Sequence, residues 1–223
     1  MNTAHELDPQ AAYALWAAHY PPHAHNAVMK AEERAMLLLL PESLHGLRVL
    51  DVGCGSGRYL LHAQQRNPTQ LVGVDLSQEM LRTAQHHNLA VAQGRTHALP
   101  VATGWADGVL CGLTLGHVAD LCAALHELAR VTRPGGWLLC SDFHSIGSTL
   151  GWRREFKANG QRYAVQHWVH SIEDWQRACQ DCGLVLTDVL EPFLAQQDIP
   201  PQAQFDPRAL EVPVASVFKI KKT

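Results

Sequence analysis

The sequence predicts an α/β fold in which a parallel sheet is connected by crossover helices. Apolar runs typical of buried strands alternate with helical patterns along most of the 223 residues. A glycine-rich turn follows the first of these runs, and acidic residues stand near the ends of the first two, at Asp51 and Asp75. Because 47% of the residues are apolar, the chain can bury a substantial core, and we expect one domain over residues 1–223.

Five apolar runs bounded by turn residues fit buried strands, at residues 47–52, 71–76, 89–93, 107–113 and 137–143. The helical patterns between them cover residues 59–66, 77–87 and 119–132. Ser77 is predicted to cap the second helix. Pro134 cannot continue the third helix, so Gly135 and Gly136 turn the chain into the next strand. This alternation predicts parallel strands joined by crossovers.

The pattern changes outside this central region. Residues 144–170 carry few strand or helix signals, whereas Ser171 is predicted to cap a helix that ends at Gly183, and strands are predicted at 184–192 and 212–220. Upstream, two helices are predicted on either side of Pro21 and Pro22. We therefore divide the domain into an N-terminal helical segment (1–40), a central α/β region (41–143), an insertion (144–170) and a C-terminal helix with strands (171–223).

Charge and composition argue against several classes of partner. The formal net charge is -3 and the densest basic stretch is residues 219–222, so no nucleic-acid partner is expected. The apolar run at 36–41 is too short to cross a bilayer, so no membrane association and a cytoplasmic location are expected. The six cysteines are expected to be reduced thiols. His167, His170, Cys179 and Cys182 have ligand-like spacing, but no metal is expected, because both cysteines fall in the last turns of a predicted helix.

The glycine-rich turn VLDVGCGSGRY (49–59) predicts a nucleotide-type ligand, since glycines leave bare backbone beside a bound molecule. A dinucleotide fingerprint would place its third glycine at position 58, where this chain has Arg58. Asp51 before the turn suits a ligand that carries an ammonium group, as S-adenosylmethionine does. Asp75 can accept hydrogen bonds from both hydroxyls of a ribose, a feature that fits NAD and S-adenosylmethionine equally.

Four motifs resemble, in order, those of class I S-adenosylmethionine-dependent methyltransferases, including type 11 methyltransferases and enzymes of the ubiquinone and biotin pathways. They are VLDVGCGSG (49–57), VGVDLSQEML (72–81), GRTHALPV (94–101) and LHELARVTRPGGWLLCSDF (125–143). The resemblance implies a Rossmann-like three-layer sandwich with a seven-stranded, mostly parallel sheet. It also implies an antiparallel last strand, supplied by residues 212–220.

The resemblance also implies where S-adenosyl-L-methionine lies. The methionine part is expected near Asp51, Gly53, Cys54, Gly55 and Gly57, with Cys111 and Gly112 facing it. The ribose is expected on Asp75, and the adenine beside Leu76, Met80, Arg95 and Thr96. An N-terminal lid is expected to contact the cofactor through Tyr20 and Asn26. Arg95 departs from the family pattern, because many relatives have there an Asp that receives the adenine amino group. Arginine has no acceptor, so Thr96 or a carbonyl is expected to replace it.

Methyl transfer from a sulfonium needs an aligned nucleophile, and a general base only when the acceptor arrives protonated. His117 and His144 follow the fourth and fifth predicted strands, where ligands of open α/β sheets bind, and are the predicted catalytic residues. Residues 151–170 are expected to cover the acceptor. Within them Arg153, Arg154, Tyr163, His167 and Trp168 could recognise a planar or anionic molecule.

The expected function is methyl transfer to O, N or C of a small-molecule acceptor by a monomer or homodimer. Within the family, the alternative is a malonyl-acyl-carrier-protein carboxyl methyltransferase of biotin synthesis, for which Arg153, Arg154, Lys157 and Arg162 would supply a basic docking surface. From other classes, a non-catalytic S-adenosylmethionine-binding protein and an NAD-dependent dehydrogenase remain open.

Overall fold

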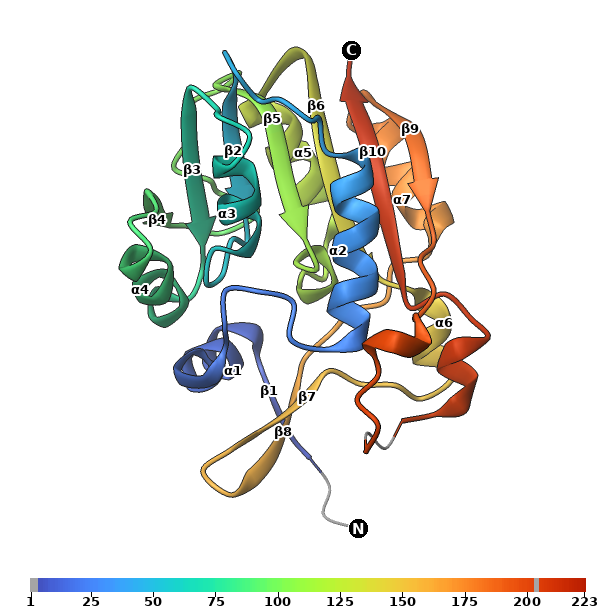
Figure 1. The fold of residues 1–223 in the computed structure, drawn as a ribbon. Helices are drawn as coiled ribbons and strands as arrows, with labels where there is room; N and C mark the ends of the chain where they lie inside the picture. The colour runs from blue at the N-terminus through green and yellow to red at the C-terminus, as the bar shows by residue number, and fades with distance from the viewer. Residues whose placement is uncertain (1–3, 203–204) are drawn as a thin grey trace.

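The computed structural model describes residues 4–202 and 205–223, which contain a seven-stranded sheet and a three-stranded sheet. The large sheet has the order β4-β3-β2-β5-β6-β10-β9 (Figure 1). Its strands are β2 (Arg48–Val52), β3 (Gln70–Asp75), β4 (Val91–Gln93), β5 (Ala106–Gly112), β6 (Thr132–Phe143), β9 (Leu184–Leu190) and β10 (Ala215–Lys222). All seven coincide with predicted strands, and the shifts in their bounds are small except at β6, which begins five residues early.

The direction of the strands confirms the predicted topology. The pairs β2–β3, β2–β5, β3–β4 and β5–β6 are parallel, and β10 is antiparallel to both β6 and β9. β10 lies between β6 and β9, with Val217 opposite Ser141 on one side and Leu190 on the other. The last strand is therefore inserted into the sheet, where both of its edges are hydrogen-bonded.

Helices cover both faces of this sheet. α2 (Ala27–Leu39) and α3 (Arg58–Gln64) lie on the face toward the viewer in Figure 1, and α5 (Leu121–Val131) and α7 (Ile172–Asp181) lie behind it. On the α5–α7 side, the fully buried Trp175 stacks on Phe218 of β10, with ring centroids 4.2 Å apart. α4 (Gln78–His86) is capped by Ser77, as predicted, and α7 by Ser171, whose partner Asp174 completes a capping box. These layers form the predicted sandwich.

The N-terminal segment divides into two parts with different roles. α1 (Pro9–Trp16) and the short helix η1 (Ala17–His19) precede the two prolines, and α2 follows them, as predicted. α2 packs into the core through Ala35 and Met36, which share a buried cluster with Leu139 and Val217. Only the part before Pro21 is thus free to act as the predicted lid, because α2 forms one layer of the sandwich.

The segment predicted to have little regular structure contains a hairpin, so that part of the prediction is wrong. After α6 (Ser145–Thr149), β7 (Glu155–Ala158) and β8 (Gln161–Val165) pair antiparallel, and β1 (His5–Leu7) adds to β8 in parallel. The turn between β7 and β8 is Asn159-Gly160, and both residues have positive φ, of 49° and 73°. Asn-Gly between short strands is a strong hairpin signal that the sequence did carry.

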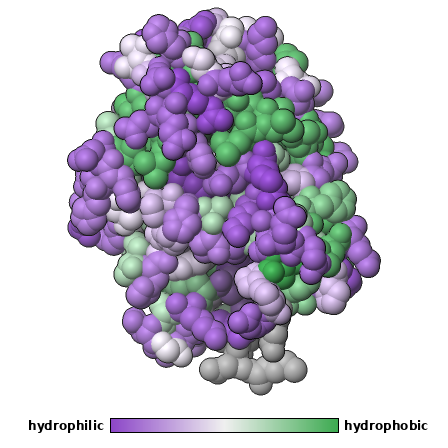
Figure 2. Space-filling model, viewed as in Figure 1, coloured by the Kyte–Doolittle hydropathy of each residue, from purple (hydrophilic) through white to green (hydrophobic). Residues whose placement is uncertain are grey.

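α1 and the β7–β8 hairpin lie beyond the edge of the sheet at which β3 and β5 end (Figure 1). That edge holds the carboxyl ends of the parallel strands, where open α/β sheets bind ligands. From the α2 side the surface is largely hydrophilic, and its hydrophobic side chains gather mainly in the upper half, away from this edge (Figure 2). None of the helices in the described part of the chain has the length and apolar character needed to cross a membrane.

Candidate functional site

A cavity of about 440 Å³ opens at the carboxyl ends of β2, β3 and β5. Its floor is the loop after β2, and its walls come from the segment after β3, the loop after β5, the N-terminal segment and the insertion. This volume falls in the range of ordinary small-molecule sites. Residues far apart in the sequence therefore meet around one space of the right size for a nucleoside and a second small molecule.

The glycine loop adopts a backbone that only glycine takes easily. Gly53, Gly55 and Gly57 have φ of 70°, 53° and 99°. A Cβ on Gly53 would lie 2.2 Å from Oγ1 of Thr114, and one on Gly57 would lie 2.4 Å from Cδ1 of Leu89. The first and second glycines line the cavity together with Cys54, whereas Gly57 begins α3 and packs against α4. The loop therefore combines backbone access to the ligand with close packing beneath it.

Asp51 is a buried acid in the cavity wall with an unused acceptor. Its side chain belongs to a residue that is only 1% exposed, and its Oδ2 has no hydrogen-bond partner in the structure. Burial raises the pKa of this carboxyl to about 8, although the nearby Arg58 opposes the rise. At neutral pH this carboxyl is therefore protonated, and a cationic group of a ligand would favour its ionised form.

Asp75, at the end of β3, holds the glycine loop in place. Its Oδ2 accepts a hydrogen bond from N of Gly55 at 2.8 Å, and its Oδ1 accepts one from N of Ser77 at 2.7 Å. Ser77 itself caps α4, so Asp75 is not the capping residue of that helix. Each carboxylate oxygen keeps a second lone pair for a ligand hydroxyl. Burial raises the pKa of Asp75 above its ordinary value, and these backbone hydrogen bonds counteract the rise.

The side of the cavity beyond Asp75 is formed by Leu76, Arg95 and Thr96. The short turn that carries Arg95 is closed by a hydrogen bond from N of Ala98 to the Arg95 carbonyl, at 3.0 Å. Thr96 and the backbone of this turn offer hydrogen-bond acceptors that an adenine amino group could use, since the Arg95 side chain has none. Met80, which we expected to line this side, is 1% exposed beneath it and is not part of the cavity wall.

His117 and Tyr13 form a hydrogen-bonded pair in the opposite wall. Nδ1 of His117 lies 3.0 Å from the carbonyl oxygen of Gln166, which can only accept, so Nδ1 carries the proton. Nε2 then accepts from the hydroxyl of Tyr13 at 2.9 Å. Burial, with help from Arg154, lowers the pKa of His117 to about 3, so the imidazole is neutral. The pair joins α1 to the loop after β5.

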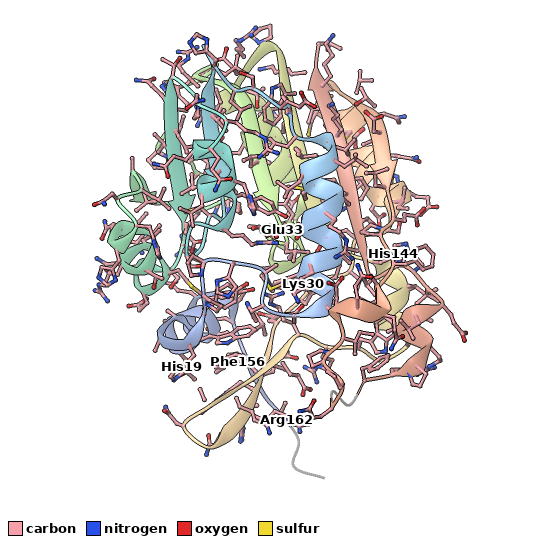
Figure 3. All side chains as sticks on the ribbon, viewed as in Figure 1. His19, Lys30, Glu33, His144, Phe156 and Arg162 are labelled. Atoms are coloured by element: carbon pink, nitrogen blue, oxygen red, sulfur yellow. The ribbon has the colours of Figure 1, made fainter. Side chains whose placement is uncertain are left out.

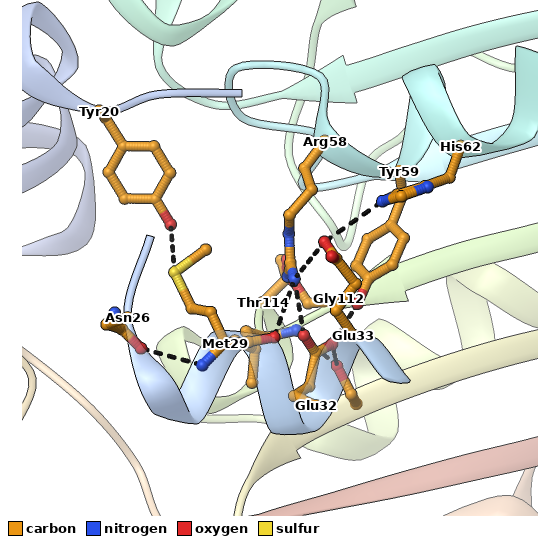
Figure 4. A network of polar contacts seen from close by, with 12 residues as sticks. Tyr20, Asn26, Met29, Glu32, Glu33, Arg58, Tyr59, His62, Gly112 and Thr114 are labelled. Atoms are coloured by element: carbon orange, nitrogen blue, oxygen red, sulfur yellow. Dashed lines mark hydrogen bonds and ion pairs between the residues drawn. The ribbon is translucent and has the colours of Figure 1, made fainter. Parts of the chain in front are cut away.

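Arg58, the residue that breaks the dinucleotide pattern, lies in a buried ionic network (Figure 4). Its Nη1 is 2.8 Å from Oε2 of Glu32 on α2, and its guanidinium lies 4.3 Å from the ring centroid of Tyr59. Glu32, which is fully buried, also accepts hydrogen bonds from the hydroxyls of Tyr59, at 2.6 Å, and Ser141. Arg58 therefore occupies the cavity wall with its charge already balanced.

Two further predicted cofactor residues lie outside the cavity wall. Asn26 is the N-cap of α2, and its Oδ1 accepts from N of Met29 at 2.9 Å (Figure 4). Cys111 is fully buried in β5, opposite Cys140 of β6. Tyr20 and Gly112, by contrast, do line the cavity. The residues outside the wall shape the elements that carry the site and make no contact with its interior.

The predicted base His144 is the N-cap residue of α6. It lies on the right in Figure 3, whereas α1 lies on the left. Its Nε2 is 2.8 Å from Oε1 of Glu191, and its Nδ1 accepts from N of Ile146. Neither ring nitrogen is therefore directed to the cavity, and of the two predicted histidines only His117 is part of its wall.

Of the residues predicted to bind the acceptor, some line the cavity and others lie outside it. Trp168 lines the cavity. Arg153 is exposed and pairs with Glu6, Tyr163 donates to Gln161 in the small sheet, and His167 lies behind His117, 3.4 Å from Oδ1 of Asp142. In the described residues, no three His, Cys, Asp or Glu side chains are grouped to hold a metal ion.

The cavity wall also includes residues that the sequence analysis did not assign to the site: Asp8, Gln10, Tyr13, Tyr59, Thr114 and Gln166. Tyr13 and Gln166 are separated by more than 150 positions in the chain, and no motif connects them. Thr114 had a detectable signal, because it follows a strand end on the edge where ligands bind.

Comparisons with known proteins find similarity to methyltransferases. Residues 50–140 match the family model described as "Methyltransferase domain". A ubiquinone biosynthesis O-methyltransferase from Alkalilimnicola ehrlichii is 32% identical in an alignment over 144 residues that covers 60% of this chain and 55% of that protein. A demethylmenaquinone methyltransferase from Listeria welshimeri is 33% identical over 122 residues, 51% of each chain. The chain thus spans about half the length of the curated relatives it matches.

The fold is also that of solved structures. The crystal structure of an S-adenosylmethionine-dependent methyltransferase from Mesorhizobium loti matches with a TM-score of 0.70 and 20% sequence identity. The match covers 86% of this chain and 98% of that one, so the similarity includes the outer strands and helices as well as the central motifs.

Proposed function

We propose that this chain, whose residues 50–140 match a methyltransferase family model, transfers a methyl group from S-adenosyl-L-methionine to O, N or C of a small-molecule acceptor. The observation that carries the proposal is one shared cavity. Asp51, the glycine loop and Asp75 line it from the ends of β2 and β3, and His117, Tyr13 and Trp168 line it from the loop after β5, the N-terminal segment and the insertion. A donor and an acceptor would therefore meet inside one enclosed space.

The donor end has the groups that S-adenosylmethionine requires. The unpaired Oδ2 of Asp51 suits its ammonium group, and the carboxylate of Asp75 suits its ribose hydroxyls. When bound, the cofactor supplies a methyl group on a positively charged sulfur. The task left to the protein is to position the acceptor in line with that methyl, an effect worth up to about 7–11 kcal/mol.

His117 and Tyr13 are the groups we assign to acceptor positioning. Because the imidazole is neutral with its proton on Nδ1, Nε2 can accept a hydrogen bond from an acceptor hydroxyl or amine in place of the Tyr13 hydroxyl. Its low pKa makes His117 a weak base. The role is therefore to orient the nucleophilic atom. A neutral amine would need no base, because the ammonium formed by methylation loses its proton to water afterwards, whereas a hydroxyl acceptor would have to reach the site already ionised.

The carrier-protein alternative has less support. It requires a basic surface beside the cavity, yet Arg153 is paired with Glu6 and Arg162 with Glu155. Arg154 lines the cavity and is partly buried. This leaves Lys157 as the only predicted docking cation in the described residues that is both exposed and free of an ion pair within 4 Å.

The proposal extends to the cellular setting. All six cysteines are free thiols, two of them, Cys122 and Cys182, with Sγ atoms 3.9 Å apart and no bond between them. Free thiols at this proximity suit a reducing compartment, so we propose a cytoplasmic location.

Calorimetry with S-adenosylhomocysteine and with NAD tests the donor assignment directly. We expect micromolar or tighter binding of S-adenosylhomocysteine and none of NAD. Binding of NAD alone would overturn the assignment. Release of S-adenosylhomocysteine in the presence of small-molecule acceptors then tests catalysis, and tight binding without turnover on any acceptor, including malonyl carrier protein, would favour a non-catalytic role.

A further inference from the structure

The guanidinium of Arg154 lies in the cavity wall without an anionic partner. Its Nη2 donates a hydrogen bond to the hydroxyl of Tyr20 at 2.9 Å, while its Nε is shielded from solvent and has no hydrogen-bond partner. Over residues 4–202 and 205–223, no ion pair within 4 Å includes Arg154. This differs from Arg58, whose charge Glu32 balances.

Aromatic rings hold this guanidinium in place. Its central carbon lies 5.7, 5.3 and 5.1 Å from the ring centroids of Tyr13, Trp16 and Phe143. Such contacts stabilise and orient a cation, but they do not neutralise its charge. Arg154 is partly buried, and a cation with reduced access to water and no anionic partner is stabilised when a ligand brings negative charge beside it.

The position of Arg154 indicates which ligand this is. Phe143 ends β6, and Tyr13 is bonded to His117 after β5, so Arg154 sits over the ends of these two strands. The groups assigned to the donor lie at the ends of β2 and β3. The guanidinium therefore lies over the ends of β5 and β6 rather than over those of β2 and β3, although its partner Tyr20 precedes Pro21, whose carbonyl accepts a hydrogen bond from Ser56 of the glycine loop. The planar donors of Arg154 fit a carboxylate or a phosphate in the same two-pronged way. One unpaired guanidinium balances the single charge of a carboxylate, whereas a phosphate group carries nearly two charges.

We infer that the acceptor is a carboxylic acid whose carboxylate is anchored by Arg154, with the methylated atom placed toward His117 and Tyr13. This rests on the proposed function, because it takes the glycine-loop end of the cavity as the donor site. The aromatic side chains of Tyr13, Tyr20 and Trp168, which line the same region, suit an acid that carries an apolar or aromatic body.

The test measures binding of benzoate, phenylacetate and hexanoate, each against its primary amide, to the protein saturated with S-adenosylhomocysteine. We expect at least one acid to bind about 30-fold or more tightly than its amide. Arg154→Met should abolish this preference, and Arg154→Lys should retain part of it. Arg153→Met is the matched control, because the guanidinium of Arg153 is exposed and paired with Glu6. This variant should keep the full preference for the acid.

Three results would overturn the inference. The first is that the unsubstituted protein prefers no acid over its amide, and the second is that Arg154→Met keeps the preference unchanged. The third is that Arg154 binds the carboxylate of S-adenosylhomocysteine itself. The last would appear as weaker binding of S-adenosylhomocysteine by Arg154→Met with unchanged binding of 5′-methylthioadenosine, which lacks that carboxylate. Unchanged affinity of Arg154→Met for 5′-methylthioadenosine also shows that the variant is folded. Failure of the unsubstituted protein to bind S-adenosylhomocysteine would instead refute the proposed function.

Discussion

The hydroxyl of Tyr13 donates a hydrogen bond to Nε2 of His117 across 2.9 Å, and so connects the N-terminal segment to the loop after β5. The two residues are 104 positions apart in the chain. Because Nδ1 of the same imidazole is committed to the carbonyl of Gln166, the insertion is joined to the same point. Three separate segments thus close the acceptor end of the cavity around one neutral histidine.

Replacing His117 should impair turnover without weakening the donor site. In His117→Phe the ring is retained but Nε2 is lost, and we expect kcat/KM to fall about 10- to 100-fold, the cost of about one to two well-placed hydrogen bonds. Affinity for S-adenosylhomocysteine should change less than about twofold. His144→Gln serves as comparison, since that histidine bonds Glu191 outside the cavity. A larger loss in His144→Gln than in His117→Phe would contradict this assignment.

Binding of S-adenosylhomocysteine should release a proton from Asp51. The carboxyl pKa is about 8 in the empty cavity, so the acid is protonated at pH 7, and a ligand ammonium favours its ionised form. Affinity should therefore rise with pH from 6 toward 8 and level off above it. Calorimetry at pH 7 in buffers of different ionisation enthalpy measures the proton. Asp51→Asn, and 5′-methylthioadenosine with the unsubstituted protein, should show no release; equal release in Asp51→Asn would identify another group.

Asp75→Asn should weaken donor binding more than loss of charge alone would suggest. Both carboxylate oxygens accept from backbone N–H groups, of Gly55 and Ser77, so an amide nitrogen would face one of these donors in either orientation. We expect at least a 10-fold loss of affinity for S-adenosylhomocysteine and about 1–3 kcal/mol lower stability to urea. Glu79→Gln is the control, because it changes an acid on the following helix that pairs with Arg82. It should leave the affinity for S-adenosylhomocysteine and the stability to urea unchanged within error.

Glu32→Ala should be strongly destabilising, because it leaves Arg58 buried with only two longer contacts, to Oε2 of Glu33 at 3.4 Å and to the Met29 carbonyl at 3.5 Å. The expected loss of unfolding free energy, measured in urea, is about 3–5 kcal/mol. The double variant Glu32→Leu/Arg58→Met removes both charges and should recover most of that loss. A double variant as unstable as the single one would show that packing of α2, rather than the ion pair, is decisive.

Much of the donor end follows from local sequence. Gly53 and Gly55 are required by positive φ in a tight turn, and Asp75 stands where β3 ends, so short-range rules place them on one edge. Arg58 shows the limit of such rules. Its presence excluded a third glycine, but its partner Glu32 lies 26 residues upstream on a helix that no motif relates to the turn.

The sequence by itself determined the elements of the layered sheet and the glycine loop, because periodicity, caps and turn residues act over a few positions, and the family resemblance added the antiparallel last strand. Only the tertiary structure decided that His117 rather than His144 lines the cavity. It also brought Tyr13 and Arg154 together there. Those placements depend on long-range packing of the N-terminal segment against the β7–β8 hairpin, and packing between distant segments leaves no periodic signal in a single sequence.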